Sequence, residues 1–540
     1  MQNFNYIEGN ICDLDKEGFF PGRIIIKNGR IFRIKKLNEK FKNYILPGFI
    51  NSHCHIESSF LPPSVFATLA VSHGTVAVVA DCHEIANVFG EKGISWMLKS
   101  ARLVPFGFFW SLPSCVPATP FETTPNKIGV KETEKYLKRK EFVSLGEMMN
   151  FPGVISGDQE IFNKIKIAKK YKKPIDGHCP QVFGENLKKY ISAGITTDHE
   201  CTNLREAKEK QKLGMIIQIR EGSSAKNLKD LIGLDYKKCF LVTDDLDVED
   251  LLRGELNEVI KKAVKLGVPF FKAIKMATVL PARHYGLNFG EIKIGKEANL
   301  SEFEDLKNLK PERVWIRGKL AFQNEKALFP KKTLGLGANI AVEIKSENDF
   351  KIRSEKNNKI RAIKLIPDQI LTEEIAVKIK PQFGELKQDL RRDILKIAAI
   401  NRYGKEYIGL GFVNGFGLKK GALASSISHD SHNLICVGAN DSDMAKAVNI
   451  LRKEGGFVFV SKNKVYKVGL PLAGLMSDKD PKKLVEDFKE LKGKLRKYGC
   501  RLGNPLSQIV FLSLLVIPEL KISDRGLFDV KKFRFTKLFV

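Results

Sequence analysis

Apolar and polar positions alternate with strand-like and then helix-like spacing through the middle of the chain. Between residues 47 and 289, short apolar runs typical of buried strands are each followed by a segment long enough for a helix. The eight runs end near His55, Asp81, Ser111, Glu147, His178, His199, Glu221 and Asp244. This alternation predicts a parallel sheet, and eight units in about 240 residues match the size of a closed (β/α)8 TIM-type barrel.

Strand-like patterns also flank the predicted barrel on both sides. Residues 23–26 and 31–34 are joined by Asn28-Gly29, a strong hairpin signal because both residues tolerate a positive φ. Short strand-like pieces recur between Gly290 and Phe322. We therefore expect residues 1–46 and 290–333 to form one small composite β domain beside a barrel of residues 47–289.

The pattern changes again after residue 333. Strands and helices are mixed over residues 334–540, with an amphipathic helix near residues 480–498 and a final apolar segment. This predicts a separate C-terminal α+β domain, so the whole chain is expected to be an α/β protein of three parts. Its 540 residues are too many for one ordinary core, in agreement with several domains.

Charge and composition exclude several classes of partner. The formal net charge is +28, but lysines are spread over helix-like stretches with acids between them, and no RNA- or DNA-binding motif is present. The longest apolar run, residues 509–517, is far shorter than the roughly 20 residues that cross a bilayer. The chain starts without a secretory pattern, and its nine cysteines form no CxxC pair. We expect a cytoplasmic protein with a small-molecule substrate and neither a nucleic-acid nor a membrane partner.

Seven of the nine histidines lie in compact polar clusters, and several follow predicted strands. One His-x-His pair at a strand end directs both side chains to the same face, and two single histidines 21 residues apart fall at equivalent heights on successive strands. Two carboxylates lie at further strand ends. The resulting candidate ligands are His53, His55, His178, His199, Glu147 and Asp244. Together they can hold two divalent cations, with one carboxylate bridging the ions.

Each of these features has a structural explanation when it is taken alone. A single buried histidine is more often structural than a ligand, and Asp244 with Asp245 could cap the next helix. His73 and His284 lie in helix-like segments, and we interpret both as structural. The spacing of the remaining candidates along one barrel favours the metal site.

The same residues lie within longer motifs that resemble the adenine deaminase family of amidohydrolases. In the barrel these motifs are PGFINSHCHIESS at 47–59, ADCHEIANV at 80–88, LGEMMNFPGV at 145–154, DGHCP at 176–180, DHECT at 198–202 and REGS at 220–223. SHDSHN at 428–433 continues the similarity into the last domain, which most amidohydrolases lack. The resemblance runs from near residue 20 to near the carboxyl end.

The resemblance implies an activity and a set of cofactors. It implies hydrolytic deamination of free adenine to hypoxanthine and ammonia, with two divalent ions that are Mn²⁺ or Fe²⁺ by preference and Zn²⁺ as an alternative. His53 and His55 would bind one ion, His178 and His199 the other, and Glu147 would bridge them, while Asp244 binds the first ion and transfers a proton. It also suggests a homo-oligomer, which we expect to be a dimer.

Other roles are assigned to residues of the same motifs. We expect Glu57, Ser58, Arg220 and Glu221 to contact the substrate. Ring nitrogen N1 of adenine must be protonated, and Glu221, His83 and Glu84 are the candidates for this acid. Asp81 and His83 could instead form an auxiliary metal site, and Glu84 could simply belong to a helix start.

Three residues that depart from the family pattern leave the substrate open. Leu246-Asp247 stands where the family has a basic residue followed by His, and Gly254-Glu255 stands where it has Gly-His, so Glu255 replaces the histidine. An amidohydrolase acting on another purine or a cyclic amide is therefore an alternative, as is a barrel that has lost turnover. A nucleic-acid deaminase is disfavoured because the chain has no P-C-x-x-C motif. We expect the last domain to cover the barrel mouth, with His429 or His432 near the site.

Overall fold

The computed structural model describes residues 5–356, 358–367 and 369–540. Contacts divide the chain into two compact units. The barrel unit contains residues 1–82, 95–114 and 129–334, and the C-terminal unit contains residues 83–94, 115–128 and 335–540. The three-domain boundaries expected from the sequence stay a prediction.

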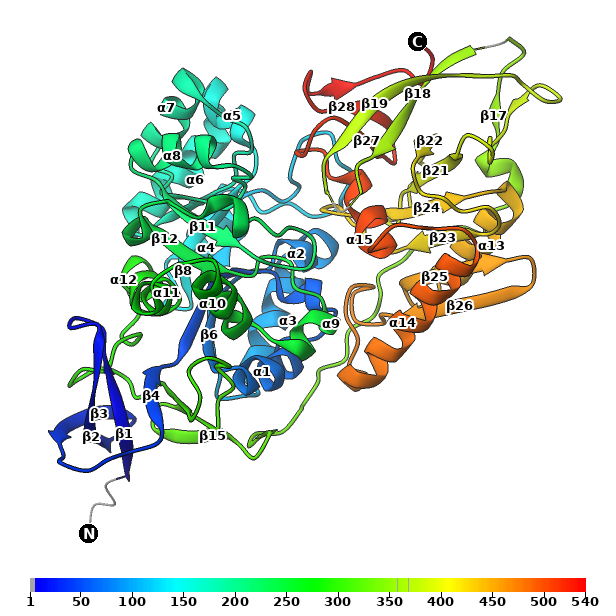
Figure 1. Cartoon of the computed structure of the whole chain (residues 1–540). Helices are drawn as coiled ribbons and strands as arrows, with labels where there is room; N and C mark the ends of the chain where they lie inside the picture. Colours follow the sequence, from blue (N-terminus) through cyan, green and yellow to red (C-terminus); the bar gives the residue numbers. More distant parts are fainter. Residues whose placement is uncertain (1–4, 357, 368) are drawn as a thin grey trace. The chain divides into compact units, whose positions relative to one another are not determined.

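Eight parallel strands form the barrel, as the alternating pattern predicted (Figure 1). Five belong to one sheet and three to another, and the parallel bridge between Cys54 and Asp244 links the last strand region to the first. The strands are β5 (Phe49–Cys54), β6 (Thr75–Asp81), β7 (Gly107–Leu112), β8 (Phe142–Met148), β9 (Ile175–Gly177), β10 (Thr197–Asp198), β11 (Ile216–Arg220) and β12 (Cys239–Val242). β5 to β8 are buried along their full length apart from the start of β7, as expected for strands covered on both faces.

Helices of the same unit pack against the outside of these strands. The main ones are α1 (Pro63–Ser72), α4 (Val130–Leu137), α6 (Gln159–Lys170), α7 (Gly184–Ser192), α8 (Leu204–Lys212), α10 (Leu256–Lys265), α11 (Phe270–Met276) and α12 (Val279–His284). α8 contacts β11, and α10 contacts β12 and β5. Ile217 and Ile219 alternate with Gln218 and Arg220, so apolar side chains face the helices while polar ones face the barrel interior.

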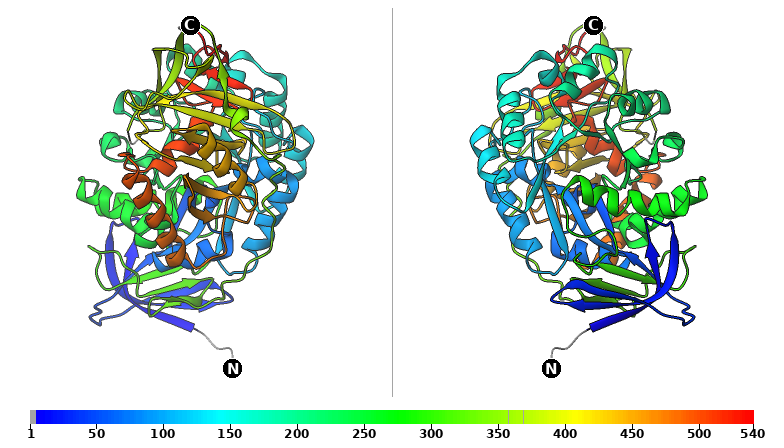
Figure 2. Two further views of the ribbon diagram at one scale, coloured as in Figure 1. Left: turned by 90° about the vertical axis from the view of Figure 1, so that its right-hand side faces the viewer. Right: turned by 90° about the vertical axis from the view of Figure 1, so that its left-hand side faces the viewer.

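A composite sheet is built from segments on both sides of the barrel in sequence. Its strand order is β16-β15-β14-β13-β4-β1-β2-β3, so strands after residue 300 join those before residue 47. Figure 2 shows the blue and green strands of this sheet side by side. The strands are β1 (Asn5–Asp13), β2 (Gly18–Lys27), β3 (Arg30–Lys36), β4 (Tyr44–Pro47), β13 (Leu300–Phe303), β14 (Arg313–Ile316), β15 (Lys319–Gln323) and β16 (Lys326–Ala327). The Asn28-Gly29 hairpin is confirmed, with φ of 51° and 76°.

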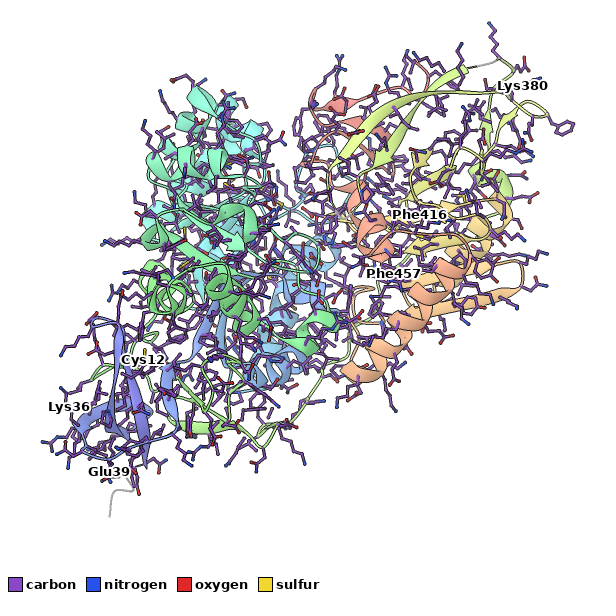
Figure 3. All side chains as sticks on the ribbon, in the orientation of Figure 1. Cys12, Lys36, Glu39, Lys380, Phe416 and Phe457 are labelled. Atoms are coloured by element: carbon purple, nitrogen blue, oxygen red, sulfur yellow. The ribbon has the colours of Figure 1, made fainter. Side chains whose placement is uncertain are left out.

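The C-terminal unit is built around an eight-stranded mixed sheet. Its order is β19-β18-β22-β21-β24-β23-β25-β26, formed by β18 (Asn358–Leu365), β19 (Thr372–Ile379), β21 (Ile394–Ile400), β22 (Ile408–Asn414), β23 (Ala422–Ser425), β24 (Leu434–Gly438), β25 (Gly456–Ser461) and β26 (Lys464–Gly469). The amphipathic helix predicted near residues 480–498 is confirmed as α14 (Pro481–Lys497). Phe457 of β25, labelled in Figure 3, lies in this unit. Its ring contacts that of Phe488 of α14, with centroids 5.9 Å apart.

Shorter elements complete the C-terminal unit. They include α2 (His83–Phe89), α13 (Asp441–Leu451), α15 (Pro505–Val510), β27 (Leu520–Ser523), β28 (Gly526–Asp529) and β29 (Arg534–Phe535). α13 covers β23, β24 and β25. In the parts of the chain that the structure describes, no helix combines the length and apolar character needed to cross a membrane.

Candidate functional site

The His-x-His pair lies where β5 ends inside the barrel. His53 and His55 are buried, and their rings meet edge to face with centroids 5.0 Å apart. His53 Nε2 lies 3.4 Å and His55 Nε2 lies 3.2 Å from the same carboxylate oxygen, Asp244 Oδ1. Alternate side chains of a strand share one face, which explains why two residues that are two positions apart converge on Asp244.

Glu147, at the end of β8, contacts three histidines that directly follow three other strands. Its Oε1 lies 3.3 Å from His55 Nε2. Its Oε2 lies 2.9 Å from His178 Nδ1 and 3.3 Å from His199 Nε2. Burial alone would raise the pKa of Glu147, but the imidazoles of His178 and His199 outweigh burial and hold that pKa well below the ordinary value. One carboxylate thus connects both halves of the predicted ligand set.

Asp244 has a backbone conformation that is uncommon for residues other than glycine. Its φ is 58°, and its N–H donates to His53 O at 3.0 Å, which fixes the residue beside β5. Burial acts to raise the pKa of Asp244, whereas contacts with His53, His55 and Arg220 lower it well below the usual range. The capping explanation does not apply to Asp244, because the side chain of Asp247 caps helix α9 (Val248–Arg253).

Arg220 joins Asp244 to a carboxylate that the sequence interpretation did not single out. Its Nη1 and Nη2 donate to the two oxygens of Glu200 at 2.6 and 2.8 Å, and Nη1 also donates to Asp244 Oδ2 at 2.9 Å. Nε donates to Asn227 Oδ1 at 3.1 Å. Glu200 directly follows His199 after the end of β10. Its position next to a proposed metal ligand was the one feature of the sequence that could have identified it as a residue of the site.

A second buried network supports the strand that carries His199. Lys210 of α8 donates to Asp198 Oδ2 at 2.9 Å and to Glu206 Oε1 at 2.8 Å, and Lys210 is fully buried. Asp198 in turn accepts from the backbone N–H of Cys179 and of Glu200. Lys210 lies in a lysine-rich helix, so nothing in the sequence distinguished it from the exposed lysines around it.

The other predicted residues of the barrel unit have varied surroundings. Asp81 accepts from Glu147 N at 3.3 Å, and its carbonyl oxygen lies 3.2 Å from His55 Nδ1. Gly146 is required there, because a Cβ at that position would lie 2.0 Å from Asp81 Oδ2. Glu57 is buried in the short 3-10 helix after β5, and Ser58 donates to Asp245 Oδ1 at 2.5 Å.

Glu221 is not brought together with the histidines. Its carboxylate accepts from Lys262 Nζ of α10 and from Leu228 N at 3.2 Å. As the residue after Arg220 it continues the set of positions that face the helix layer. The structure therefore places this predicted acid and substrate contact against α10.

The three departures from the family motifs have local structural roles. Leu246 is buried, and Asp247 accepts from Asp250 N at 2.9 Å as the helix cap. Glu255 is fully buried and accepts from Asn51 Nδ2 at 2.5 Å and from Thr75 Oγ1, at the amino end of β6. Each of these three residues thus has a structural role, and none of them belongs to the six proposed metal ligands.

His83 and Glu84 belong to the C-terminal unit, at the start of α2. His83 Nε2 lies 3.5 Å from Asp430 Oδ1, and Glu84 lies 3.6 Å from His429 Nδ1 and 3.9 Å from His432 Nε2. Glu84 is in the first turn of its helix, as the structural explanation required. His73 Nε2 contacts Leu251 O at 2.9 Å, and His284 ends α12.

The barrel site fits divalent ions. Its proposed ligands are imidazoles and carboxylates in three overlapping groups whose ligand atoms lie within 4.8 Å of one another: His53, His55 and Glu147; His53, His199 and Asp244; and Glu147, His178 and His199. Across the residues described, His53 Nε2, which faces Asp244 Oδ1, is buried without a hydrogen-bond partner. A buried polar atom without a partner is costly, and an ion bound by this nitrogen would remove that cost.

Comparisons with known proteins agree with this arrangement. Residues 44–321 match the amidohydrolase family, and residues 369–534 match the adenine deaminase C-terminal domain. An adenine deaminase of Methanosphaera stadtmanae is 42% identical over 535 residues, which cover 98% of each chain. Those of Methanothermobacter thermautotrophicus and Borreliella burgdorferi are 42% and 41% identical, and the alignments cover 98% of this chain and 99% and 98% of theirs.

Proposed function

This chain belongs to the amidohydrolase family and to the adenine deaminases within it, and we propose that it hydrolyses free adenine to hypoxanthine and ammonia. The family is metal-dependent, and the chain carries candidate metal-binding clusters of His, Asp and Glu. The observation that carries the proposal is the position of Glu147, whose two oxygens contact the histidines that directly follow β5, β9 and β10.

In this proposal two divalent ions are held by the six barrel residues. His53 and His55 would hold one ion with Asp244, His178 and His199 the other, and Glu147 would lie between them. Bound divalent ions lower the pKa of a water ligand from 15.7 to about 7, which makes hydroxide accessible at neutral pH. Mn²⁺ or Fe²⁺ is the proposed identity, with Zn²⁺ as the alternative, because imidazole and carboxylate ligands suit all three.

Asp244 is proposed to move the protons of the reaction. The water oxygen bonds to C6, the bond from C6 to the amino nitrogen breaks, and the two water protons pass to N1 and to the leaving amine. Asp244 takes a proton from the attacking water through Oδ1, while Arg220 holds Oδ2 at 2.9 Å. In this proposal Oδ1 of Asp244 accepts the proton, and Oδ2 holds the carboxylate in position through its hydrogen bond with Arg220.

Arg220 is proposed to be a positioning residue that acts through Asp244. Its guanidinium donates to Glu200, Asp244 and Asn227. These contacts engage its two terminal nitrogens and its Nε. Glu57 and Ser58 remain the proposed substrate contacts from the motif after β5, and His83 and Glu84 remain candidates for the acid at N1.

Other properties are proposed from family membership alone. We propose a cytoplasmic enzyme with a small-molecule substrate and a homodimeric state. The dimer can be tested by light scattering of the purified chain, and a monomeric mass at micromolar concentration would contradict it.

The proposed activity is tested by ammonia release. Protein reconstituted with Mn²⁺ is assayed with adenine, adenosine, guanine and cytosine, with and without a chelator. Turnover of adenine that the chelator abolishes is the expected result. Turnover of another purine instead would favour the alternative amidohydrolase activity. Metal binding without ammonia from any substrate would overturn the proposal and indicate a barrel that has lost turnover.

A further inference from the structure

A second group of imidazoles and carboxylates lies wholly within the C-terminal unit. Glu84 Oε1 lies 3.6 Å from His429 Nδ1, His429 Nδ1 lies 3.9 Å from Asp430 Oδ1, and Asp430 Oδ1 lies 3.5 Å from His83 Nε2. Ligand atoms of His83 and Glu84 lie within 4.8 Å of each other, which closes the ring. Each of the four residues, which come from two distant segments at 83–84 and 429–430, therefore lies near two others of the group.

The separations of these donors fit a single small cation. Donor atoms bound about 2.1 Å from a tetrahedral ion are about 3.4 Å apart. The three contacts of 3.5 to 3.9 Å between these donors need only shorten by a few tenths of an ångström. Two imidazoles with two carboxylates are a ligand set that suits Zn²⁺, Mn²⁺ or Fe²⁺.

The group is buried and its geometry is fixed by neighbouring contacts. His83, Glu84, His429 and Asp430 are each at most 6% exposed. The ring of His429 stacks on Phe511, with centroids 4.4 Å apart and an angle of 11°. Within the described chain, Asp430 Oδ2 is buried without a hydrogen-bond partner. Two carboxylates in such a place need cations or strong donors to offset the loss of water.

His432 supports this group from its outer side. Its Nδ1 accepts from Ser428 N at 3.3 Å, which leaves the proton of a neutral ring on Nε2. That nitrogen lies 3.9 Å from Glu84 Oε2, the oxygen opposite the one facing His429. Arg402 donates to His432 O at 3.1 Å and thereby anchors the turn. At 3.9 Å this contact is longer than a hydrogen bond, and an imidazole in this position can orient a ligating carboxylate from outside the ligand set.

We propose that His83, Glu84, His429 and Asp430 bind a divalent transition-metal ion in the C-terminal unit, in addition to the two ions proposed for the barrel. This assignment replaces the auxiliary pair of Asp81 and His83, because Asp81 belongs to the barrel unit and its carboxylate accepts a hydrogen bond from Glu147 N. Metal binding by His83 and Glu84 is also an alternative to their proposed role as the acid that protonates N1. A pure acid leaves the metal content unchanged, so metal stoichiometry decides between the two roles.

The test is a metal count on the full chain. Apoprotein is dialysed against Mn²⁺ or Zn²⁺, passed through a desalting column and analysed by inductively coupled plasma mass spectrometry. We expect about three ions per chain in the unsubstituted protein and one fewer in His429→Gln and in Asp430→Asn. Ser428→Ala is the matched control, since Ser428 directly precedes His429 and is not a proposed ligand, and it should retain all three.

A barrel variant separates this inference from the proposed function. His53→Ala combined with His199→Ala removes a ligand of each proposed barrel ion, so this variant should lose both barrel ions and deaminase activity yet still bind one ion through the C-terminal unit. In that background, Co²⁺ should produce an absorption band that disappears on adding Asp430→Asn, and Zn²⁺ should raise the melting temperature. Two ions in the unsubstituted protein, with the same two in folded His429→Gln, would overturn the third site and leave the barrel proposal intact.

Discussion

Buried carboxylates occur at both ends of the barrel, and their surroundings are opposite. At the carboxyl ends of the strands, Glu147 and Asp244 contact imidazoles and Arg220, and these contacts lower the pKa of both acids. Glu255 is equally buried beside the amino end of β6. Its partners are Asn51, Thr75 and the N–H of Leu256, and burial raises its pKa despite these hydrogen bonds.

The difference shows that burial alone does not make a carboxylate functional. All three acids have lost water to a similar extent, with exposures of 3%, 6% and 1% for Glu147, Asp244 and Glu255. Neutral hydrogen-bond donors offset only part of the free-energy cost of burying a charged carboxylate, so its pKa stays raised. Cationic partners or metal ions outweigh that cost, so the pKa falls below its ordinary value. We therefore expect substitutions at the carboxyl end to affect turnover and those at the amino end to affect stability.

The largest effect is expected for Asp244→Asn, which tests the carboxyl end directly. An amide cannot accept the water proton, so kcat for adenine should fall by about 10³-fold, within the range for loss of a general base. Asp247→Asn is the control, because asparagine also caps a helix well and Asp247 is in the same loop. Metal content measured alongside shows whether ligand loss contributes. Activity within tenfold of the unsubstituted enzyme would remove Asp244 from the mechanism.

Arg220→Met should give the next largest effect by removing the cation between two buried acids. Leaving Glu200 and Asp244 without this partner should reduce the free energy of unfolding by about 3–5 kcal/mol, measured by urea denaturation. Adding Glu200→Met to Arg220→Met should restore part of the loss, because one uncompensated charge is removed. A double variant less stable than Arg220→Met would contradict the pairing. Turnover should stay low in the single and the double variant, since both lack the hydrogen bond from Arg220 that orients the Asp244 carboxylate.

At the amino end, Glu255→Gln should change the pH dependence of stability. The pKa of Glu255 is higher in the folded state than in the unfolded state, where it is near 4.5. The protonated carboxyl therefore contributes fully to the free energy of unfolding below pH 4.5, and this contribution is lost as the pH rises towards the folded-state pKa. The glutamine variant lacks this titration. Its unfolding free energy relative to the unsubstituted protein should therefore increase from pH 4.5 upward, by as much as about 1.4 kcal/mol per pH unit.

The control for that measurement is an exposed acid on the same helix. Glu258 pairs with Lys261 on the surface of α10, so Glu258→Gln should give a curve parallel to that of the unsubstituted protein. Should Glu255→Gln also run parallel, Glu255 would be ionised in the folded state. The two ends of the barrel would then no longer differ in the way proposed.

Strand-end residues were predictable from the sequence because periodicity fixes where a strand stops. The ends of β5, β6, β8 and β12 all lie within two residues of the positions expected from the pattern. Partners across the barrel were not predictable in the same way. Glu200 and Lys210 look like ordinary acids and lysines along the chain, and only the folded structure shows them buried and paired.

The division into units was also outside the reach of sequence pattern. Residues 83–94 and 115–128 lie between barrel strands in sequence but belong to the C-terminal unit. Local periodicity reports whether a segment is helical and does not report which distant segment it packs against. His83 and Glu84 were accordingly identified as chemically interesting residues without their partners His429 and Asp430.

The smallest effect is expected for Glu221→Gln, and it tests whether a strand-end acid must be functional. Glu221 pairs with Lys262, a side chain 39% exposed, and such pairs contribute about 0–1 kcal/mol. We expect kcat to change by less than about fivefold and stability by less than about 1 kcal/mol. Lys262→Met breaks the same pair from the other side and should behave alike. A hundredfold loss of kcat in Glu221→Gln, but not in Lys262→Met, would show that Glu221 reaches the substrate. Functional and structural acids would then be found side by side at the carboxyl ends of the strands, and the difference between the two ends of the barrel would not be enough to separate them.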